Sequence, residues 1–152
     1  MKLENCKKRI SKHLNSRAED FKAFMNADDL ENVSEDVGSF YDYGLHFGFV
    51  EPNTFNDQEE GYYRYQLSWG GPSDEILFYE DGTIEYWFKD WFDGASQDIS
   101  NEDWALWLKD WFEDVGSIDW ENVPNEEEIA ETESALMIAR TLKRDYRPPI
   151  KD

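Results

Sequence analysis

The clearest fold signal in this chain lies in residues 62–94, YYRYQLSWGGPSDEILFYEDGTIEYWFKDWFDG. Alternation of apolar and polar side chains predicts a half-buried strand, and residues 62–69 alternate in this way. Residues 70–73 then supply glycine, proline and serine, which favour turns. Residues 75–80 resume an extended pattern, and residues 84–92 alternate once more. The stretch therefore predicts three consecutive antiparallel strands with aromatic side chains.

The connections on either side of these strands also carry signals. Asp81-Gly82 is a strong hairpin signal, and it predicts a two-residue type I′ loop with positive φ at both positions. Upstream, residues 43–50 alternate and predict a further strand, while residues 26–42 and the acidic stretch 51–61 predict loops. The sheet should therefore contain about four strands.

Helical patterns lie outside the sheet segment. Leu3, Cys6, Ile10 and Leu14 recur at helical spacing among lysines, and residues 16–19 form a capping-box pattern that predicts the start of a second helix. We expect these basic helices to dock on the acidic remainder of the chain rather than on a membrane. A last helix, introduced by Pro124, is predicted over residues 126–144, with glutamates first and basic residues last.

After Gly94 the apolar period changes from 2 to about 3.6 residues, which predicts an acidic, tryptophan-rich helix over residues 101–115. Ser100 has the chemistry of its N-cap, and Gly116 should end it. One face carries the apolar residues Trp104, Trp107, Leu108, Trp111 and Phe112, and the other carries acids. We expect Trp87 or Phe88 to share one core with Trp104, Trp107 and Trp111.

These patterns predict an α+β fold, in which an antiparallel sheet of about four strands is flanked by helices at both ends of the chain. With 152 residues, we expect one domain over residues 1–152. Its parts are the basic helical N-terminus 1–27, the sheet core 43–94, the acidic helix 101–115 and the C-terminal helix 126–144.

Charge is distributed very unevenly along the chain, whose net charge is −20. Residues 1–27 carry a net +4 and residues 136–152 a net +3. Residues 28–135 hold thirty Asp and Glu against three bases, which are Arg64, Lys89 and Lys109. Like charges at this density repel one another and destabilise the compact state, so we expect the excess to serve binding, with solubility as the alternative explanation.

The strings RYQLSWGGPSDE (64–75), EYWF (85–88) and DWFDGA (90–95), with Tyr43-Gly44-Leu45 before them, resemble a family of small acidic proteins. Members of this family are carried by bacterial plasmids and integrative conjugative elements. The resemblance covers roughly residues 40–96 and leaves out both ends of the chain. It implies no biochemical activity, but it implies a setting in mobile DNA, where evasion of host defence is a common task.

Several chemistries lack a signal in the sequence. One cysteine and two histidines provide no zinc-binding or nucleophilic cluster, and the glycines of residues 70–71 precede no phosphate-binding Lys-Ser/Thr pair. We expect no cofactor, no metal and no catalysis. Without a secretory signal or a long apolar run, the sequence predicts a cytoplasmic protein with no membrane segment and no disulfide. Direct binding to DNA or RNA is disfavoured by charge.

Three functions remain open. The first is an acidic inhibitor or decoy that imitates nucleic acid and blocks a basic, nucleic-acid-handling protein of host defence, as anti-restriction or anti-CRISPR proteins do. The second is an acidic protein-interaction module without mimicry, and the third is a carbohydrate-active or other hydrolase with an acid pair in an aromatic cleft. For partner binding, the acids expected to matter are Asp90, Asp93, Glu102, Asp103, Asp110, Glu113 and Asp114.

Overall fold

The computed structural model describes residues 5–90 and 93–124. The chain divides into two units, Met1–Trp120 and Glu121–Asp152, and the first contains every helix and strand described below. The helix expected over residues 126–144 and the end of the strand expected over residues 84–92 lie outside the described residues.

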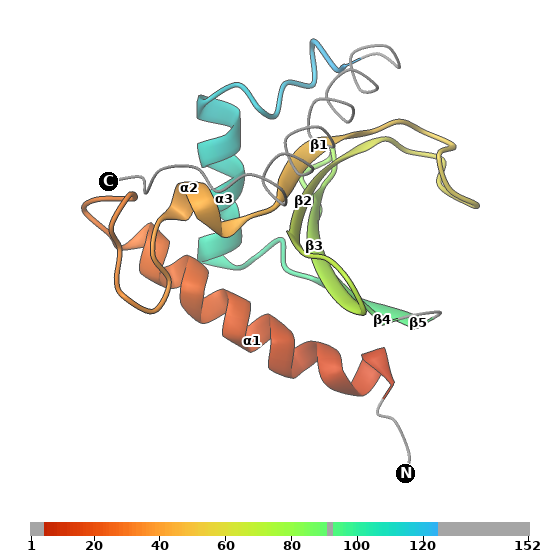
Figure 1. Ribbon diagram of the computed structural model, residues 1–152. Coiled ribbons are helices and arrows are strands. Elements are labelled where there is room, and N and C mark those ends of the chain that lie inside the picture. The colour runs from red at the N-terminus through yellow and green to blue at the C-terminus, as the bar shows by residue number, and fades with distance from the viewer. Residues whose placement is uncertain (1–4, 91–92, 125–152) are drawn as a thin grey trace, which may run out of the picture. The chain divides into compact units, whose positions relative to one another are not determined.

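The fold class is α+β, as predicted, with a five-stranded antiparallel sheet in the order β1-β2-β3-β4-β5 (Figure 1). Its strands are β1 His46–Val50, β2 Tyr62–Ser68, β3 Pro72–Phe78, β4 Ile84–Asp90 and β5 Asp93–Asp98. The estimate of about four strands omitted β5. This edge strand, DGASQD, is almost entirely exposed and so carries no alternating apolar pattern.

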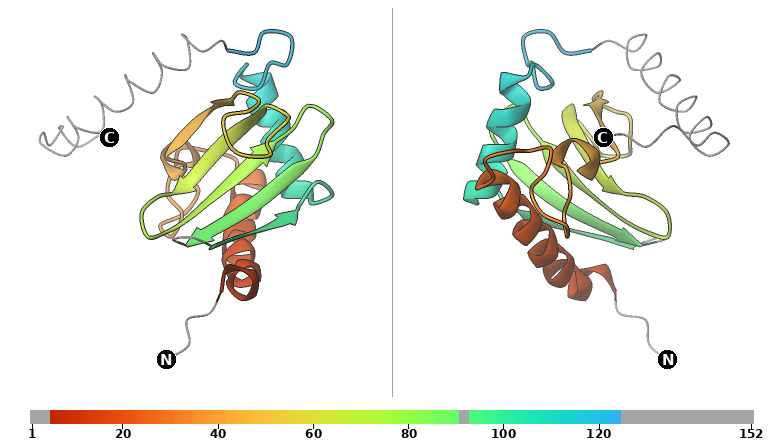
Figure 2. Two further views of the ribbon diagram at one scale, coloured as in Figure 1. Left: turned by 90° about the vertical axis from the view of Figure 1, so that its right-hand side faces the viewer. Right: turned by 60° about the vertical axis from the view of Figure 1, so that its left-hand side comes forward.

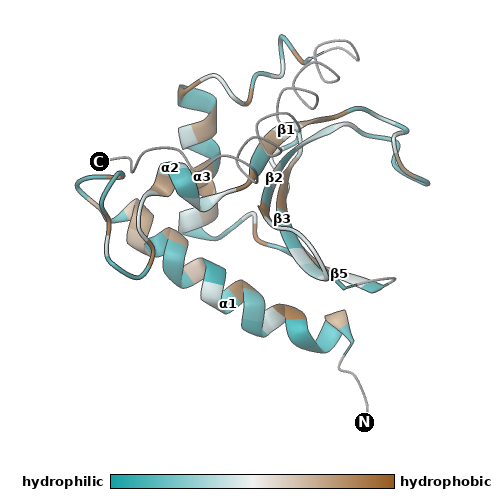
Figure 3. Cartoon of the chain, viewed as in Figure 1, coloured by the Kyte–Doolittle hydropathy of each residue, from teal (hydrophilic) through white to brown (hydrophobic). Residues whose placement is uncertain are grey.

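The three helices of the first unit lie on one side of the sheet (Figures 1 and 2). They are α1 Cys6–Met25, α2 Phe40–Tyr43 and α3 Asp103–Asp114. The sheet curves so that its opposite face, which these helices leave uncovered, is concave (Figure 1). In Figure 3 the long loops between α1 and α2 and between β1 and β2 are mainly hydrophilic.

The prediction of two N-terminal helices was wrong, because α1 is one continuous helix of 20 residues. Asn5 is its N-cap and accepts a hydrogen bond from the amide of Lys8 at 3.1 Å. Ser16, the expected second N-cap, lies exposed in the middle of α1. A single buried stripe runs past it and keeps the segment helical: Cys6, Ile10, Leu14, Phe21 and Phe24.

Aromatic rings from the sheet and the helices form the core between them. Phe112 of α3 stacks on Phe47 of β1 with 4.1 Å between ring centroids, and Phe21 of α1 stacks on Trp104 of α3 at 5.3 Å. The expected shared core is correct for Phe88 and Trp104, which are both buried. Trp87 instead occupies the opposite face of β4.

Trp107 and Trp111 lie at the margin of this core, where both are half-buried. Their rings pack edge-on against Phe40 of α2, at 5.4 and 4.7 Å. The sequence assigned them correctly to the apolar side of α3, but it did not predict α2, whose four residues are too few to show a period.

Two local predictions need correction. The β3–β4 loop is longer than a two-residue type I′ turn: the Gly82 amide donates to the Tyr79 carbonyl at 3.1 Å, and only Gly82 has positive φ. The N-cap of α3 is Glu102 rather than Ser100, whose hydroxyl accepts a hydrogen bond from the amide of Ile84 at 2.8 Å. Gly116, at φ 84°, ends the helix as predicted.

Candidate interaction surfaces

The basic residues of α1 pair with acids of the sheet. Arg17 binds the carboxylate of Asp74 through two hydrogen bonds, at 2.7 and 3.0 Å. Asp74 is 5% exposed and also accepts hydrogen bonds from the hydroxyls of Ser68 and Tyr86. Docking of the basic N-terminal segment on the acidic body is therefore part of how the fold is held.

Burial alone would raise the pKa of Asp74, but the hydrogen bonds and positive charge of Arg17 outweigh it and hold this pKa below its usual value. Burial and the nearby Asp74 carboxylate raise the pKa of Tyr86, so its hydroxyl stays protonated and donates. The resulting network fixes the position of α1 on the sheet. It also places two residues of the SWGGPSDE string, Ser68 and Asp74, in one structural role.

Two of the predicted partner-binding acids, Asp90 and Asp93, are engaged with α1. Asp90 forms an ion pair with Arg9. Asp93 accepts a hydrogen bond from the backbone amide of Cys6 at 2.8 Å, and this bond lowers the Asp93 pKa. Both acids therefore hold the N-terminus of α1 against the β4–β5 hairpin.

The other five predicted acids are exposed on or beside α3. Asp110 has 68% of its side-chain surface exposed and Glu113 has 43%, with Lys109 lying 3.6 Å from Glu113. At 100° per residue, Asp103, Asp110 and Asp114 fall within an arc of about 40°, beside the stripe of Trp107 and Trp111. The remaining acid, Glu102, is the N-cap.

The structure does not bring all seven acids together. In the strand register, Asp90 lies opposite Asp93 at one end of the β4–β5 hairpin. Glu85 lies opposite Asp98 at the other end, from which the chain continues into α3. The pairs are five residues apart along β5, or about 17 Å.

Sequence reasoning missed the aromatic residues that α2 adds beside the acids of α3. Tyr41 is 57% exposed, and its ring lies 6.1 Å from that of Trp111. We call the combined area the α3 surface, and it comprises Tyr41, Asp103, Trp107, Asp110, Trp111, Glu113 and Asp114. The loop that precedes α2 also carries five exposed acids, which are Asp28, Asp29, Glu31, Glu35 and Asp36.

The uncovered face of the sheet carries a second feature that the sequence prediction did not include. Glu75, next to Asp74 in sequence, is buried on this opposite face. Its carboxylate lies 2.6 Å from the ammonium of Lys89 and 3.9 Å from Nε of Arg64. Two of the three bases of residues 28–135 thus converge on one carboxylate.

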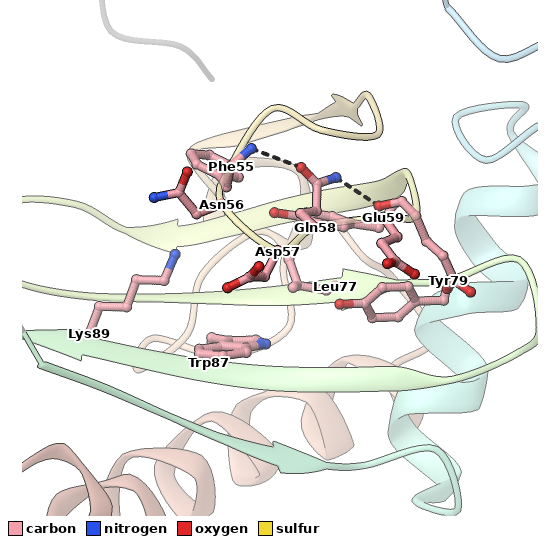
Figure 4. A pocket seen from close by; sticks show the side chains of 11 residues that line it. Phe55, Asn56, Asp57, Gln58, Glu59, Leu77, Tyr79, Trp87 and Lys89 are labelled. Atoms are coloured by element: carbon pink, nitrogen blue, oxygen red, sulfur yellow. Dashed lines mark hydrogen bonds between the residues drawn. The ribbon is translucent and has the colours of Figure 1, made fainter.

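Beside this charged cluster, the uncovered face and the β1–β2 loop enclose a groove of about 510 Å³ (Figure 4). Tyr62, Leu77, Tyr79, Trp87 and Lys89 line it from the strands and the turn, and residues 55–60 line it from the loop. One signal for it was present in the sequence. Tyr62 and Trp87 are large aromatic residues on the otherwise polar side of alternating strands.

The chain matches no protein-family model, and the searches of curated proteins and of solved structures found no similar protein. Within residues 5–90 and 93–124, no helix combines the length and apolar character that a membrane crossing requires. The same part of the chain contains no group of three or more His, Cys, Asp or Glu side chains placed to hold a metal ion.

Proposed function

We propose that the protein acts by binding and not by catalysis, as an acidic inhibitor or decoy for a basic, nucleic-acid-handling protein. The α3 surface is the observation that supports this proposal. There the acids are exposed while the opposite side of α3 is anchored in the core by Trp104, Leu108 and Phe112. Asp103, Asp110 and Asp114 thus form a row of carboxylates on a folded helix, and this arrangement is preorganised to bind a basic groove.

The dimensions of the row suit imitation of nucleic acid. Asp103, Asp110 and Asp114 follow the helix over eleven residue steps, or about 16 Å at 1.5 Å per residue. A DNA duplex of this length contains about five base pairs. Proteins that bind such a duplex supply Lys and Arg to match its phosphates. The α3 surface would cover those side chains and exclude the nucleic acid.

The setting follows from the resemblance to acidic proteins of plasmids and conjugative elements. A protein of mobile DNA benefits from blocking a host restriction enzyme or CRISPR effector, both of which work on nucleic acid through basic surfaces. We place this activity in the bacterial cytoplasm, where such enzymes act.

A second candidate is an acidic interaction module whose basic partner does not use the covered surface for nucleic acid. The aromatic centre of the α3 surface favours it, because Tyr and Trp surrounded by polar residues are typical of protein–protein interfaces. Duplex phosphates have no aromatic counterpart, so Tyr41 and Trp111 would add contacts that mimicry alone does not need.

Binding through the α3 surface can be tested by capture from a bacterial lysate with quantitative mass spectrometry. The test variant carries Asp110→Lys, Glu113→Lys and Asp114→Lys, and the matched control carries Glu19→Lys, Glu80→Lys and Asp81→Lys, away from the α3 surface. Both change the net charge equally at exposed positions. We expect the wild type and the control to retain a nucleic-acid-handling partner and the α3 variant to lose it. Equal retention by both variants would contradict the proposal.

A further inference from the structure

The groove between the uncovered sheet face and the β1–β2 loop is built from fixed parts. On the sheet side, Val50, Tyr62 and Leu77 form a small buried cluster, against which Tyr79 and Trp87 pack. The carboxylate of Glu85 accepts hydrogen bonds from the Tyr79 hydroxyl at 2.9 Å and from the Trp87 indole at 3.2 Å. The polar edges of both rings are thereby held in place.

The loop side of the groove is held by Gln58. Its side-chain amide donates to the carbonyls of Glu51 and Glu60, at 2.9 and 2.7 Å, and its oxygen accepts from the amides of Thr54 and Phe55. The hydrogen bonds drawn in Figure 4 belong to this set. The loop is therefore an ordered wall, which presents Phe55 and the acids Asp57, Glu59 and Glu60 to the groove.

The charge of the groove selects the sign of its ligand. Of the eleven residues that line it, Asp57, Glu59 and Glu60 are acidic and Lys89 alone is basic. In Figure 4 the Asp57 carboxylate points from the loop toward the strand residues. An anion would be repelled here. A neutral sugar would gain only hydrogen bonds to the carboxylates, whereas a cation would also be attracted by their net negative charge.

Lys89 shows that this face already accommodates a cation. Its ammonium lies 5.9 Å from the centre of the Trp87 ring and 2.6 Å from the buried carboxylate of Glu75. An aromatic face combined with a carboxylate is the environment that stabilises organic cations in proteins. The groove repeats this combination with Phe55, Tyr62 and Tyr79 beside the three loop acids.

We propose that the groove binds the guanidinium group of an arginine in a basic peptide segment. Guanidinium is planar and more weakly hydrated than ammonium, so it stacks on aromatic faces while its N–H groups donate to carboxylates. The rings of Phe55 and Tyr79 provide the stacking faces, and the loop acids accept its hydrogen bonds. This site lies on the side of the sheet opposite the helices, and it is separate from the α3 surface.

The test uses N-acetyl-arginine amide as the probe and N-acetyl-citrulline amide, which has the same shape without the charge, as its control. NMR spectra of ¹⁵N-labelled protein at physiological salt follow the indole signal of Trp87, assigned with Trp87→Phe. We expect saturable shifts of this signal with the arginine probe and binding weaker by about tenfold or more with citrulline. Equal binding of the two probes would overturn the proposal.

Two variants locate the site. Neutralisation of the groove by Asp57→Asn, Glu59→Gln and Glu60→Gln should weaken arginine binding by about tenfold, because the exposed loop acids supply the attraction. Neutralisation of the α3 surface by Asp110→Asn, Glu113→Gln and Asp114→Asn should leave binding within about twofold. The reverse pattern would place the arginine on α3. Because partner capture depends on α3 and arginine binding on the loop, either proposal can fail while the other holds.

Discussion

The α1–sheet interface and the α3 surface are both rich in acids, yet they use them differently. At the α1–sheet interface, Asp74 and Asp90 meet Arg17 and Arg9, and Asp93 meets a backbone amide. At the α3 surface, Asp110 and Asp114 are exposed, and Lys109 is the only base on the helix. The groups that face an acid therefore determine what it contributes. Net charge alone does not distinguish an acid that holds the fold from one available to a partner.

The largest effect is expected where α3 meets the α1–sheet interface. Trp104 is 1% exposed and stacks on Phe21, so Trp104→Ala should lower the free energy of unfolding by about 3–5 kcal/mol. Trp107→Ala, at the half-buried margin, should cost only about 1–2 kcal/mol. Chemical denaturation of the two variants measures both. Equal costs would show that the two sides of the tryptophan stripe are packed alike.

Removal of one interface acid should have the next largest effect. Asp74→Asn leaves the Arg17 guanidinium without its counter-charge, and we expect a loss of about 2–3 kcal/mol, less than for a fully buried pair because Arg17 is partly exposed. Asp110→Asn on the α3 surface should change stability by less than about 0.5 kcal/mol. If denaturation gave similar values for the two, the distinction between the regions would fail.

The pH dependence of stability tests the role of Asp74 at the α1–sheet interface. Because the folded-state pKa of Asp74 is lowered from 3.8, its stabilisation is fully present above the unfolded-state pKa. It is lost as the pH falls from there through the lower folded-state pKa. The difference in unfolding free energy between wild type and Asp74→Asn should therefore shrink from about pH 4 downward. A difference that stays constant to about pH 2 would contradict the lowered pKa.

The smallest effect on stability should come from the α3 surface. The triple change Asp110→Asn, Glu113→Gln and Asp114→Asn removes three negative charges and both ion pairs of Lys109, with Asp110 at 4.0 Å and with Glu113 at 3.6 Å. These contributions oppose each other, and we expect thermal unfolding to shift by no more than a few degrees. A large destabilisation would mean that these acids belong to the fold, as Asp74 does.

The spacing of apolar residues and the positions of turn-forming residues predicted much of the fold. Three strands within residues 62–94 and the apolar side of α3 followed from alternation and helical spacing, because burial on one side imposes those periods. The β5 strand did not follow, since an exposed edge needs no apolar residues. At Ser16 the sequence suggested a helix start that does not occur. The buried apolar stripe of α1 continues past this residue and packs on the sheet, which outweighs the local capping pattern.

The candidate sites were less predictable, because they depend on contacts between distant segments. The sequence suggested that Asp90 and Asp93 are available to a partner. In the structure Arg9 binds Asp90 and the Cys6 amide binds Asp93, in each case from more than eighty residues away in the chain. The α3 acids were found because helical spacing alone groups them. The groove required the fold, since residues 55–60 reach Tyr62 and Trp87 only when the β1–β2 loop and the sheet are in place.

The most direct test of the central claim is competition for the captured partner between this protein and the partner's nucleic acid. A fluorescently labelled duplex bound to that partner is titrated with wild-type protein, and anisotropy reports release. We expect stoichiometric release, which weakens with added salt and is abolished by Asp110→Lys, Glu113→Lys and Asp114→Lys. A ternary complex, in which the saturated partner keeps its duplex, would contradict it.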